Sequence, residues 1–317
     1  MKGKKNRNVL LYYPPNNRSV AIETIAAEVN SKGHNLIVLT TSERGVFHEQ
    51  LDKLGVKNFN VTFEKRSALV YYFKHLRYLI SFCRKHRIDT VWSHLQSCNI
   101  VAVLAQAFIK CRVVIFRHHF HAIIKEKGLS AVNRNELLFE RIICRLAREI
   151  VVPSNEVYNG MVSYEKVPAR KIKIIPYIYD FSAYPKPDAS VITAITRQYA
   201  ASLLIVVASR MIPMKRHMLV LPVFDQLIKE GLDIKVLLLD DGEERPKLEA
   251  YVKEQALEGR IFFLGFKKNI IDYLAASDLL VHPSATEASS SLVKEFGLMK
   301  KPVIVCSGVG DFDQYII

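Results

Sequence analysis

The sequence predicts an α/β protein made of two doubly wound parallel-sheet domains in series. The chain has 317 residues, of which 50% are hydrophobic, and this is enough for two separate cores. Short, continuously apolar strands alternate with helical patterns, which is typical of parallel sheets covered on both faces. The alternation stops once, in a polar, Pro-containing stretch, and then restarts. We therefore expect a first domain over residues 1–183, a linker over 184–191 and a second domain over 192–317.

The first domain is expected to begin with a buried strand over residues 9–13 and an amphipathic helix over 20–32, which Gly33 and His34 end. The remaining elements predicted for this domain are strands at 36–40, 89–94, 113–116 and 149–152, and an apolar helix that follows the second of these and runs to residue 109. Residues 66–87 combine apolar and aromatic residues with a basic border. They fit an interfacial helix as well as an ordinary helix packed on the sheet, and both interpretations stay open.

The second domain repeats the pattern with five apolar strands. They are expected at residues 203–207, 234–239, 261–264, 279–281 and 303–305. In open α/β sheets ligands bind outside the carboxyl ends of the strands, so the loops that follow these strands are where candidate site residues are expected.

Composition excludes several classes of protein. No run approaches the roughly 18 apolar residues of a membrane span. The five cysteines are odd in number and lack C-x-x-C spacing, so we expect reduced thiols, a cytosolic protein and no metal site. Residues 1–190 hold 30 Lys/Arg and 15 Asp/Glu (+15), and residues 191–317 hold 15 and 16 (−1), which together give the net charge of +14. This basic first half attracts anionic lipid or phosphorylated acceptors, but no motif accompanies it that predicts a nucleic-acid partner.

Two glutamates eight residues apart are the most informative motif. Glu287 is predicted in a loop after a strand, and Glu295 on the helix that begins near Ser290 and runs to the Lys300-Lys301-Pro302 stretch. Ser289, Ser290 and Ser291 fall at the helix N-terminus, where free N–H groups and the helix dipole favour a phosphate. A carboxylate facing a sugar, a phosphate cradle and a second carboxylate on vicinal hydroxyls together fit a nucleotide-sugar. The same spacing also arises by chance in helical proteins.

Residues that follow other strands are weaker candidates for the site. Arg210 and Lys215 follow a strand of the second domain and fit a diphosphate, although in isolation a solvated basic loop is the favoured interpretation. Gly265 follows another strand and lets the backbone approach a base. His118 follows a strand of the first domain, where a single histidine can hydrogen-bond a sugar or assist proton transfer. A structural polar loop is the alternative, and the spacing of the neighbouring histidines does not favour zinc.

In their order and spacing these motifs resemble the family 4 retaining glycosyltransferases of the GT-B fold. The resemblance is strongest over residues 203–310, through Arg210…Lys215, Asp241-Gly242, Phe263-Leu264-Gly265, Ala276-Ser277-Asp278, Pro283-Ser284, Glu287-x7-Glu295 and Lys301-Pro302-Val303-Ile304. In the first domain Gly33-His34, Ser154 and Ile175 to Asp180 match further family motifs. The resemblance implies that Arg210 and Lys215 bind the donor diphosphate. It also implies that Glu287 lies near the donor sugar, Glu295 on the ribose hydroxyls and His118 at the reaction centre.

The sequence departs from the family pattern at several positions. Pro14 to Ser19 replace a Gly-rich loop, and Tyr177-Ile178 replace the Asn-Gly of a Pro-Asn-Gly motif. Asp240, Arg216 and Ser289-Ser290 also stand where the family has other residues. Helices that normally follow the second domain are absent from the sequence, so we expect that domain to be incomplete.

The sequence and the resemblance together predict a retaining hexosyltransferase that needs neither metal nor cofactor. The expected donor is a UDP- or GDP-linked sugar, and the expected acceptor is an anionic or lipid-linked glycan, as in polysaccharide assembly. The basic first domain is expected to contact the anionic inner face of the cell membrane peripherally. The alternatives are a non-catalytic nucleotide-sugar binding module and a sugar-nucleotide epimerase.

Overall fold

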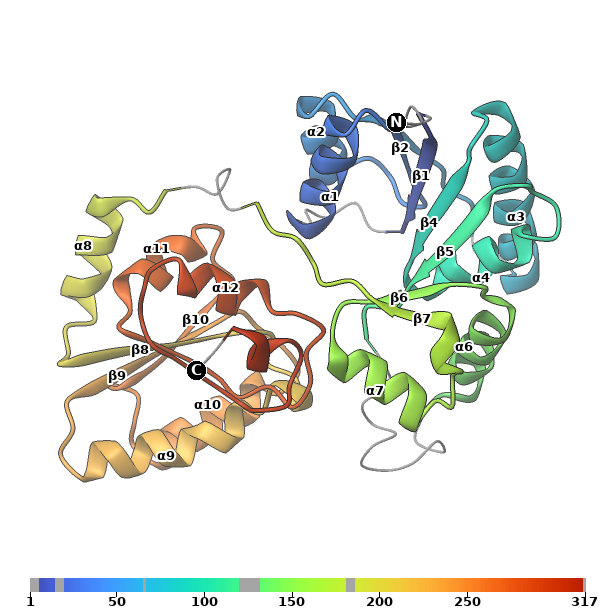
Figure 1. Ribbon diagram of the computed structural model, residues 1–317. Coiled ribbons are helices and arrows are strands. Elements are labelled where there is room, and N and C mark those ends of the chain that lie inside the picture. The colour runs from blue at the N-terminus through green and yellow to red at the C-terminus, as the bar shows by residue number, and fades with distance from the viewer. Residues whose placement is uncertain (1–5, 15–19, 65–66, 120–131, 181–185, 316–317) are drawn as a thin grey trace. The chain divides into compact units, whose positions relative to one another are not determined.

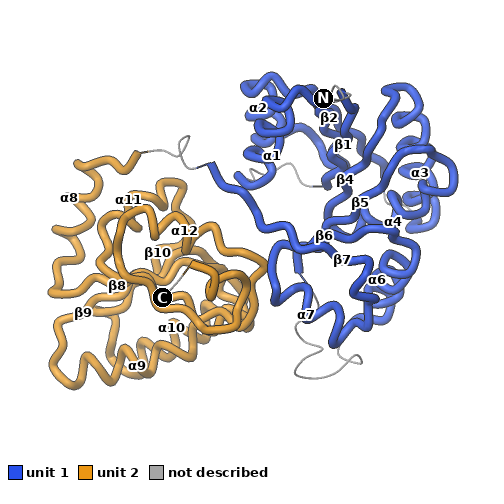
Figure 2. The backbone as a smooth tube through the Cα atoms, in the orientation of Figure 1, with its two compact units in different colours: residues 1–180 blue, residues 181–317 orange. Residues whose placement is uncertain are grey.

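The computed structural model describes residues 6–14, 20–64, 67–119, 132–180 and 186–315. The chain divides into two compact units, residues 1–180 and 181–317 (Figure 2). Each unit is built on one parallel sheet with helices on both faces, which confirms the predicted α/β, doubly wound fold class (Figure 1).

The first unit contains a seven-stranded sheet of order β3-β2-β1-β4-β5-β6-β7. The strands are β1 Asn8–Tyr13, β2 Asn35–Thr40, β3 Lys57–Asn60, β4 Thr90–His94, β5 Arg112–Phe116, β6 Ile150–Val152 and β7 Ile172–Ile174. All of these strands pair in parallel. The strand order reverses at β1, which pairs with both β2 and β4, so the carboxyl ends of β1 and β4 mark the switch point where such sheets bind ligands.

Helices cover both faces of this sheet. They are α1 Val20–Ser31, α2 Val46–Lys53, α3 Ala68–Lys85, α4 Leu95–Ala105, α6 Arg134–Leu146 and α7 Asn155–Ser163. Because β1 is covered on both faces, its successive residues Val9, Leu10, Leu11 and Tyr12 are all buried. Val9 and Leu11 pack with Ile22 of α1 and Phe47 of α2, while α3, α4 and α6 pack side by side along the sheet.

The second unit contains a five-stranded parallel sheet of order β10-β9-β8-β11-β12. The strands are β8 Leu203–Ala208, β9 Ile234–Leu239, β10 Ile261–Gly265, β11 Leu279–His282 and β12 Val303–Val305. The helices α9 His217–Lys229 and α10 Arg245–Glu254 cover one face (Figure 1). The other face is covered by α8 Ala189–Gln198, α11 Ile270–Ala276 and α12 Ser291–Gly297. Here the order reverses at β8, between β9 and β11.

Several predicted boundaries were wrong. The helix after β4 ends at Ala105 rather than at residue 109, and α12 ends at Gly297, before the predicted stop. Residues 189–191, interpreted as linker, begin α8, whose N-cap Asp188 accepts a hydrogen bond from the Ser190 amide at 2.8 Å. Residues 184 and 185 of the predicted linker, and 15–19 of the loop that replaces the Gly-rich segment, lie outside the described residues.

The sequence analysis missed β3 and β7. Both are edge strands of the first sheet, and their sequences, KNFN and IKI, are short and partly exposed. Both strands contain polar residues, so neither forms the apolar run by which the other strands were predicted.

Candidate functional site

In the second unit, Glu287 lies at the centre of a charged cluster at the carboxyl ends of β8 and β11. Its Oε1 accepts a hydrogen bond from Nε2 of His282, the last residue of β11, at 2.7 Å. The same oxygen forms an ion pair with the Lys215 ammonium group. The Ser284 hydroxyl lies 3.2 Å from His282 Nε2. The side chains of Lys215 and Glu287 are 15% and 13% exposed, so the pair is shielded from water but reachable from the surface.

This cluster fixes the ionisation of Glu287. Burial disfavours the charged carboxylate, but the hydrogen bond from His282 and the charge and hydrogen bond of Lys215 outweigh it and lower the pKa of Glu287 to about 2. Glu287 is therefore an anion at neutral pH, and Lys215 is held beside it.

Backbone contacts bring the loops of this site together. The Ala285 amide donates to the Met214 carbonyl at 2.9 Å, which ties the loop after β11 to the short 3-10 helix η3 (Pro213–Lys215) that carries Lys215. A Cβ on Gly242 would meet the Met211 carbonyl oxygen at 2.4 Å, so only glycine fits between the loops after β8 and β9. Gly310 has a φ of +59° and packs on Glu287, whose Cβ would lie 3.1 Å from an added Cβ.

Arg210, the other predicted diphosphate ligand, lies in a different environment from Lys215. It follows β8 and is exposed, and within the described part of the chain its side chain forms no hydrogen bond or ion pair. Gly265 ends β10 with a φ of +66°, and its carbonyl accepts a hydrogen bond from the Asp240 amide at 2.9 Å. Glu295 is 9% exposed on α12, between the core residues Val293 and Phe296.

The three serines at the start of α12 have local roles. Ser290 is the N-cap, and its hydroxyl accepts a hydrogen bond from the Val293 amide at 3.4 Å. The Ser289 hydroxyl donates to Asp311 at 2.9 Å and lies 2.6 Å from the Lys294 ammonium group. Ser291 is the first residue of the helix. The side chains of Ser289 and Ser290 are therefore already hydrogen-bonded to other groups of the second unit. An anion at this position would be held by backbone amides.

In the first unit, His118 forms part of a chain of aromatic side chains near the switch point. Its Nε2 lies 2.9 Å from Nδ1 of His94, the last residue of β4, and its Nδ1 is hydrogen-bonded to the Tyr177 hydroxyl. His94 stacks on Phe116 with 4.3 Å between ring centroids, and Tyr13 packs against its edge. Both ring nitrogens of His118 are thus occupied by protein partners.

These histidines are neutral. Burial lowers the pKa of His118 to about 4, and the nearby His119 and Arg117 act in the same direction. Burial also moves the pKa of His94 well below its ordinary value, and His118 adds to that effect. Burial raises the pKa of Tyr177. The cluster carries no net charge near pH 7.

The hydrogen-bonding pattern favours one tautomer. His94 Nε2 is buried without a hydrogen-bond partner among the described residues. If Tyr177 donated to His118, then His118 would donate to His94 and leave a buried N–H unpaired at His94 Nε2. The reverse direction leaves only an unpaired acceptor there, which costs less. In that arrangement His94 donates to His118, His118 donates to the Tyr177 oxygen, and the Tyr177 hydroxyl proton is free to bind a ligand.

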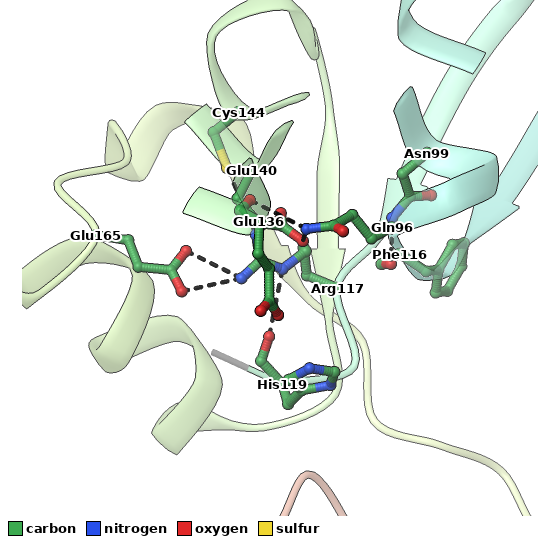
Figure 3. Close-up of polar contacts among 9 residues, drawn as sticks. All are labelled: Gln96, Asn99, Phe116, Arg117, His119, Glu136, Glu140, Cys144 and Glu165. Carbon is green, nitrogen blue, oxygen red and sulfur yellow. Dashed lines mark hydrogen bonds and ion pairs between the residues drawn. The ribbon is translucent and has the colours of Figure 1, made fainter. Parts of the chain in front are cut away.

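A group of charged side chains in the first unit lies beside the hydrogen-bonded series of His94, His118 and Tyr177. The Arg117 guanidinium pairs with Glu140 and, at 2.9 and 3.0 Å, with both oxygens of Glu165 (Figure 3). Gln96 donates to Glu140 at 3.0 Å. Arg117 is 5% exposed, so this is a buried structural ion cluster that ties β5 to α6 and to the segment after α7.

The sequence analysis missed three residues of these clusters: His94, Tyr177 and His282. His94 and His282 each end an apolar strand, and a polar residue at that position of a buried parallel strand was the available signal. Tyr177 stands where the family motif has asparagine, and the sequence analysis assigned no function to that difference.

Neither a metal site nor a membrane-spanning helix is found within the described ranges. No group of three or more His, Cys, Asp or Glu there is placed to hold a metal ion. No helix of the described part of the chain is both long and apolar enough to cross a bilayer.

The two doubly wound units define a protein of the GT-B fold class. HepE of Anabaena, solved in complex with UDP, superposes with a TM-score of 0.76 at 19% identity over 96% of this chain and 82% of HepE. A glycosyltransferase of Rickettsia africae superposes with a TM-score of 0.76 at 18% identity over 98% and 82% of the two chains. At this level of identity the likeness concerns the fold.

The particular family follows from the sequence. Residues 19–182, more than half of the chain, match the model of Glycosyltransferase Family 4, and residues 192–317 match that of Glycosyl transferases group 1. The chain therefore belongs to Glycosyltransferase Family 4, as the motifs suggested.

Curated relatives are distant. An uncharacterized glycosyltransferase of Methanocaldococcus jannaschii is 21% identical over 80% of this chain and 64% of its own length. The Campylobacter jejuni enzyme described as N-acetylgalactosamine-N,N'-diacetylbacillosaminyl-diphospho-undecaprenol 4-alpha-N-acetylgalactosaminyltransferase is 24% identical over 71% of this chain and 59% of its own length. The Escherichia coli enzyme described as UDP-Gal:alpha-D-GlcNAc-diphosphoundecaprenol alpha-1,3-galactosyltransferase is 24% identical over 89% and 76% of the two chains. This chain thus spans about three fifths of the first two relatives.

Proposed function

We propose that this protein is a glycosyltransferase that binds a UDP-linked sugar in its second unit and transfers the sugar to a lipid-linked glycan with retention. The observation that carries the proposal is the Glu287–Lys215–His282 cluster at the carboxyl ends of β8 and β11, with the exposed Arg210 following β8. Family membership supports the transfer reaction. The complexes of HepE with UDP and UDP-glucose support UDP over GDP as the nucleotide of the donor.

The charges of the cluster suit a departing diphosphate. Arg210 has no competing partner in the described part of the chain, so its guanidinium is available for a bidentate contact with phosphate oxygens. Lys215 is a point charge held in place by Glu287. As the bond to the sugar breaks, these two cations stabilise the charge that develops on the diphosphate. The proposed mechanism therefore needs no metal ion.

Glu287 and Glu295 are assigned to the donor on the family pattern. Glu287 is ionised, because His282 and Lys215 hold its pKa at about 2, and a carboxylate of that kind suits the hydroxyls and the developing positive charge of a sugar ring. Glu295 is proposed to bind the ribose hydroxyls. The backbone of Gly265 and the amides at Ser289, Ser290 and Ser291 are the remaining proposed donor contacts.

The acceptor is proposed to contact the first unit. Two relatives are named for acceptors linked to diphospho-undecaprenol, which supports an anionic, lipid-linked acceptor. The first half of the chain carries the excess positive charge, and α3 exposes Leu69 (82%), Val70 (47%) and Phe73 (56%), with the Arg77 guanidinium 5.8 Å from the centre of the Phe73 ring. An apolar helix face with a cationic border suits peripheral contact with an anionic membrane at the cytoplasmic side.

In this scheme His118 acts through Tyr177. The hydroxyl proton of Tyr177 is available to a sugar oxygen of the acceptor, because His118 supplies the other hydrogen bond of that hydroxyl. A neutral His118 and a protonated phenol can position a sugar hydroxyl without repelling an anionic acceptor.

Calorimetry with UDP-glucose, GDP-mannose and ADP-glucose tests the donor site. We expect one UDP-sugar to bind and Arg210→Ala to weaken that binding at least tenfold, because a hydrogen bond to a charged group is worth about 1.5–3 kcal/mol. The matched control is Lys253→Ala, which removes an exposed cation from the last turn of α10 and leaves binding unchanged. Equal affinity of the wild type and Arg210→Ala contradicts the proposed diphosphate site.

Product analysis separates the alternatives. Incubation of the bound donor with a polyprenyl-diphosphate-linked sugar yields a longer glycan if the protein is a transferase. A binding module leaves the donor intact, and an epimerase isomerises it without an acceptor. The anomeric coupling in the NMR spectrum of the product tests retention.

A further inference from the structure

A cavity lies at the amino edge of the first sheet, opposite to the carboxyl edge that carries His94 and His118. It is separate from the proposed donor and acceptor sites. Its volume is about 490 Å³, and it is lined by Cys83, Arg84, Arg87, Ile88, Asp89, Phe108, Ile109, Lys110 and Cys111. The cavity lies between the end of α3 and the segments that lead into β4 and β5. His94 and His118 belong to the other ends of those strands, so the proposed reaction does not use this cavity.

Two of the five cysteines share the cavity, far apart in the sequence but adjacent in the fold. Cys83 lies on α3 and is 4% exposed, whereas Cys111 directly precedes β5 and is partly exposed. Both are free thiols, and both line this cavity. The cavity opens on a thiol pair with one accessible and one buried member.

The two thiols differ in acidity. The neighbouring Cys111 thiol and burial raise the pKa of Cys83. The neighbouring Cys83 thiol lowers the pKa of Cys111, against the opposing effects of burial and of the Asp89 carboxylate. The accessible thiol is thus the one that more readily becomes a thiolate, and the thiolate is the nucleophile in disulfide exchange.

The charged lining of the cavity is mainly cationic. The Arg84 guanidinium donates to the Phe108 carbonyl at 3.2 Å, and the side chains of Arg87 and Lys110 are exposed without a hydrogen bond or ion pair to any described residue. The one carboxylate, Asp89, accepts a hydrogen bond from the Asn8 amide at 2.8 Å. Three cations around one carboxylate attract an anionic reagent.

We propose that Cys83 and Cys111 form a redox-modification site that exchanges with small disulfides bearing carboxylates. The Cys111 thiolate attacks one sulfur of the reagent RSSR, forms a mixed disulfide and releases RS⁻, which takes up a proton. The Cys83 thiol then attacks the Cys111 sulfur and forms the Cys83–Cys111 disulfide, and its proton goes to the second RS⁻, which leaves as RSH. The reagent is reduced by two electrons to two thiols, and the protein pair is oxidised by two.

The cross-link adds a covalent bond where the hydrogen bond from Arg84 to the Phe108 carbonyl already links the end of α3 to the segment before β5. It ties the last turns of α3 to the start of β5, and so fixes the helix that also carries the exposed apolar residues Leu69 and Phe73. The modification is independent of the proposed transfer reaction, and it stands or falls without any nucleotide-sugar.

The test is incubation of the full chain with oxidised glutathione, an anionic disulfide, followed by peptide mass spectrometry. We expect a transient glutathione adduct on Cys111 that converts to the Cys83–Cys111 disulfide. In Cys83→Ser the adduct on Cys111 should accumulate, and in Cys111→Ser neither product should form. The matched control is Cys144→Ser, which removes a buried thiol of the same unit whose pKa burial raises to about 12, and which leaves both products unchanged.

The charge of the reagent tests the lining of the cavity in the unmodified protein, which removes any dependence on how the variants fold. Oxidised glutathione should react with Cys111 at least tenfold faster than cystamine, a cationic disulfide, and added salt should reduce the difference. Equal rates for the two reagents, or a glutathione adduct on Cys111 that never resolves to the internal disulfide, overturn the proposal.

Discussion

The carboxyl edges of the two sheets each carry a cluster of polar side chains, but one cluster is neutral and the other is charged. In the first unit the edge carries three neutral groups, His94, His118 and Tyr177. Burial lowers the pKa values of the two histidines and raises the pKa of Tyr177. In the second unit the edge carries the ion pair of Glu287 and Lys215, in which Lys215 helps to lower the pKa of Glu287. Both sets lie beside the switch point of a doubly wound sheet, so the fold dictates their position and not their charge.

Under the proposed function, this difference would let one fold support two binding tasks. A neutral edge can orient a sugar hydroxyl by hydrogen bonds, and a charged edge can hold a diphosphate and stabilise its release. The first unit also contains charges at this edge, but Arg117, which directly follows β5, pairs with Glu140 and Glu165 in a buried cluster that fixes the structure (Figure 3).

Removing the buried cation of the first unit should have the largest effect. Arg117→Met leaves Glu140 and Glu165 buried without their partner, and we expect a loss of about 3–5 kcal/mol in the free energy of unfolding, measured by denaturant titration. The matched control is Arg112→Met. Arg112 pairs with Glu149 at the surface, where its side chain is 51% exposed, and its loss should cost at most about 1 kcal/mol. Equal losses in the two variants contradict the assignment of Arg117 to a buried structural cluster.

Removing the cation of the charged edge should have an intermediate effect. Lys215→Met removes the cation that is paired with Glu287, so we expect the pKa of Glu287 to rise from about 2 and the second unit to lose about 2 kcal/mol. NMR titration of the Glu287 carboxyl and denaturant unfolding measure these two quantities. Arg210→Met is the control, because this exposed cation has no partner among the described residues, and it should change stability by less than about 0.5 kcal/mol.

The neutral edge should produce a smaller, pH-dependent effect. The pKa of His118 is about 4 in the folded state, below its ordinary value of 6.5. Between these values the unfolded chain binds more protons than the folded one, so the free energy of unfolding rises with pH from about 4 to 6.5 and levels off above. We expect His118 to contribute about 1–2 kcal/mol to this rise, after allowance for its partial exposure.

Urea unfolding of the wild type and His118→Gln between pH 4 and 8 measures that contribution. The variant should have the shallower slope below pH 6.5, and the two slopes should agree above it. A His118 imidazole that titrates near 6.5 in the NMR spectrum of the folded protein excludes a neutral edge.

The sequence predicted the positions of most strands, because a strand covered on both faces needs an uninterrupted apolar run, and β1, β8 and β9 each have one. It missed β3 and β7, whose short sequences KNFN and IKI contain polar residues, whereas the edge strands β10 and β12 have apolar runs and were predicted. The same logic applies to the site. Glu287, Lys215 and Arg210 follow strands, and their spacing was enough to place them at one edge of a sheet.

The sequence alone determined the fold class, the family and the segments from which site residues come. These depend on local periodicity and on the order of short motifs, both of which are written along the chain. Only the tertiary structure decided which residues are charged and which are paired. It placed His282 on Glu287, Tyr177 on His118 and Cys83 beside Cys111, and ionisation follows from such neighbours and from burial, which are distances in space rather than along the chain.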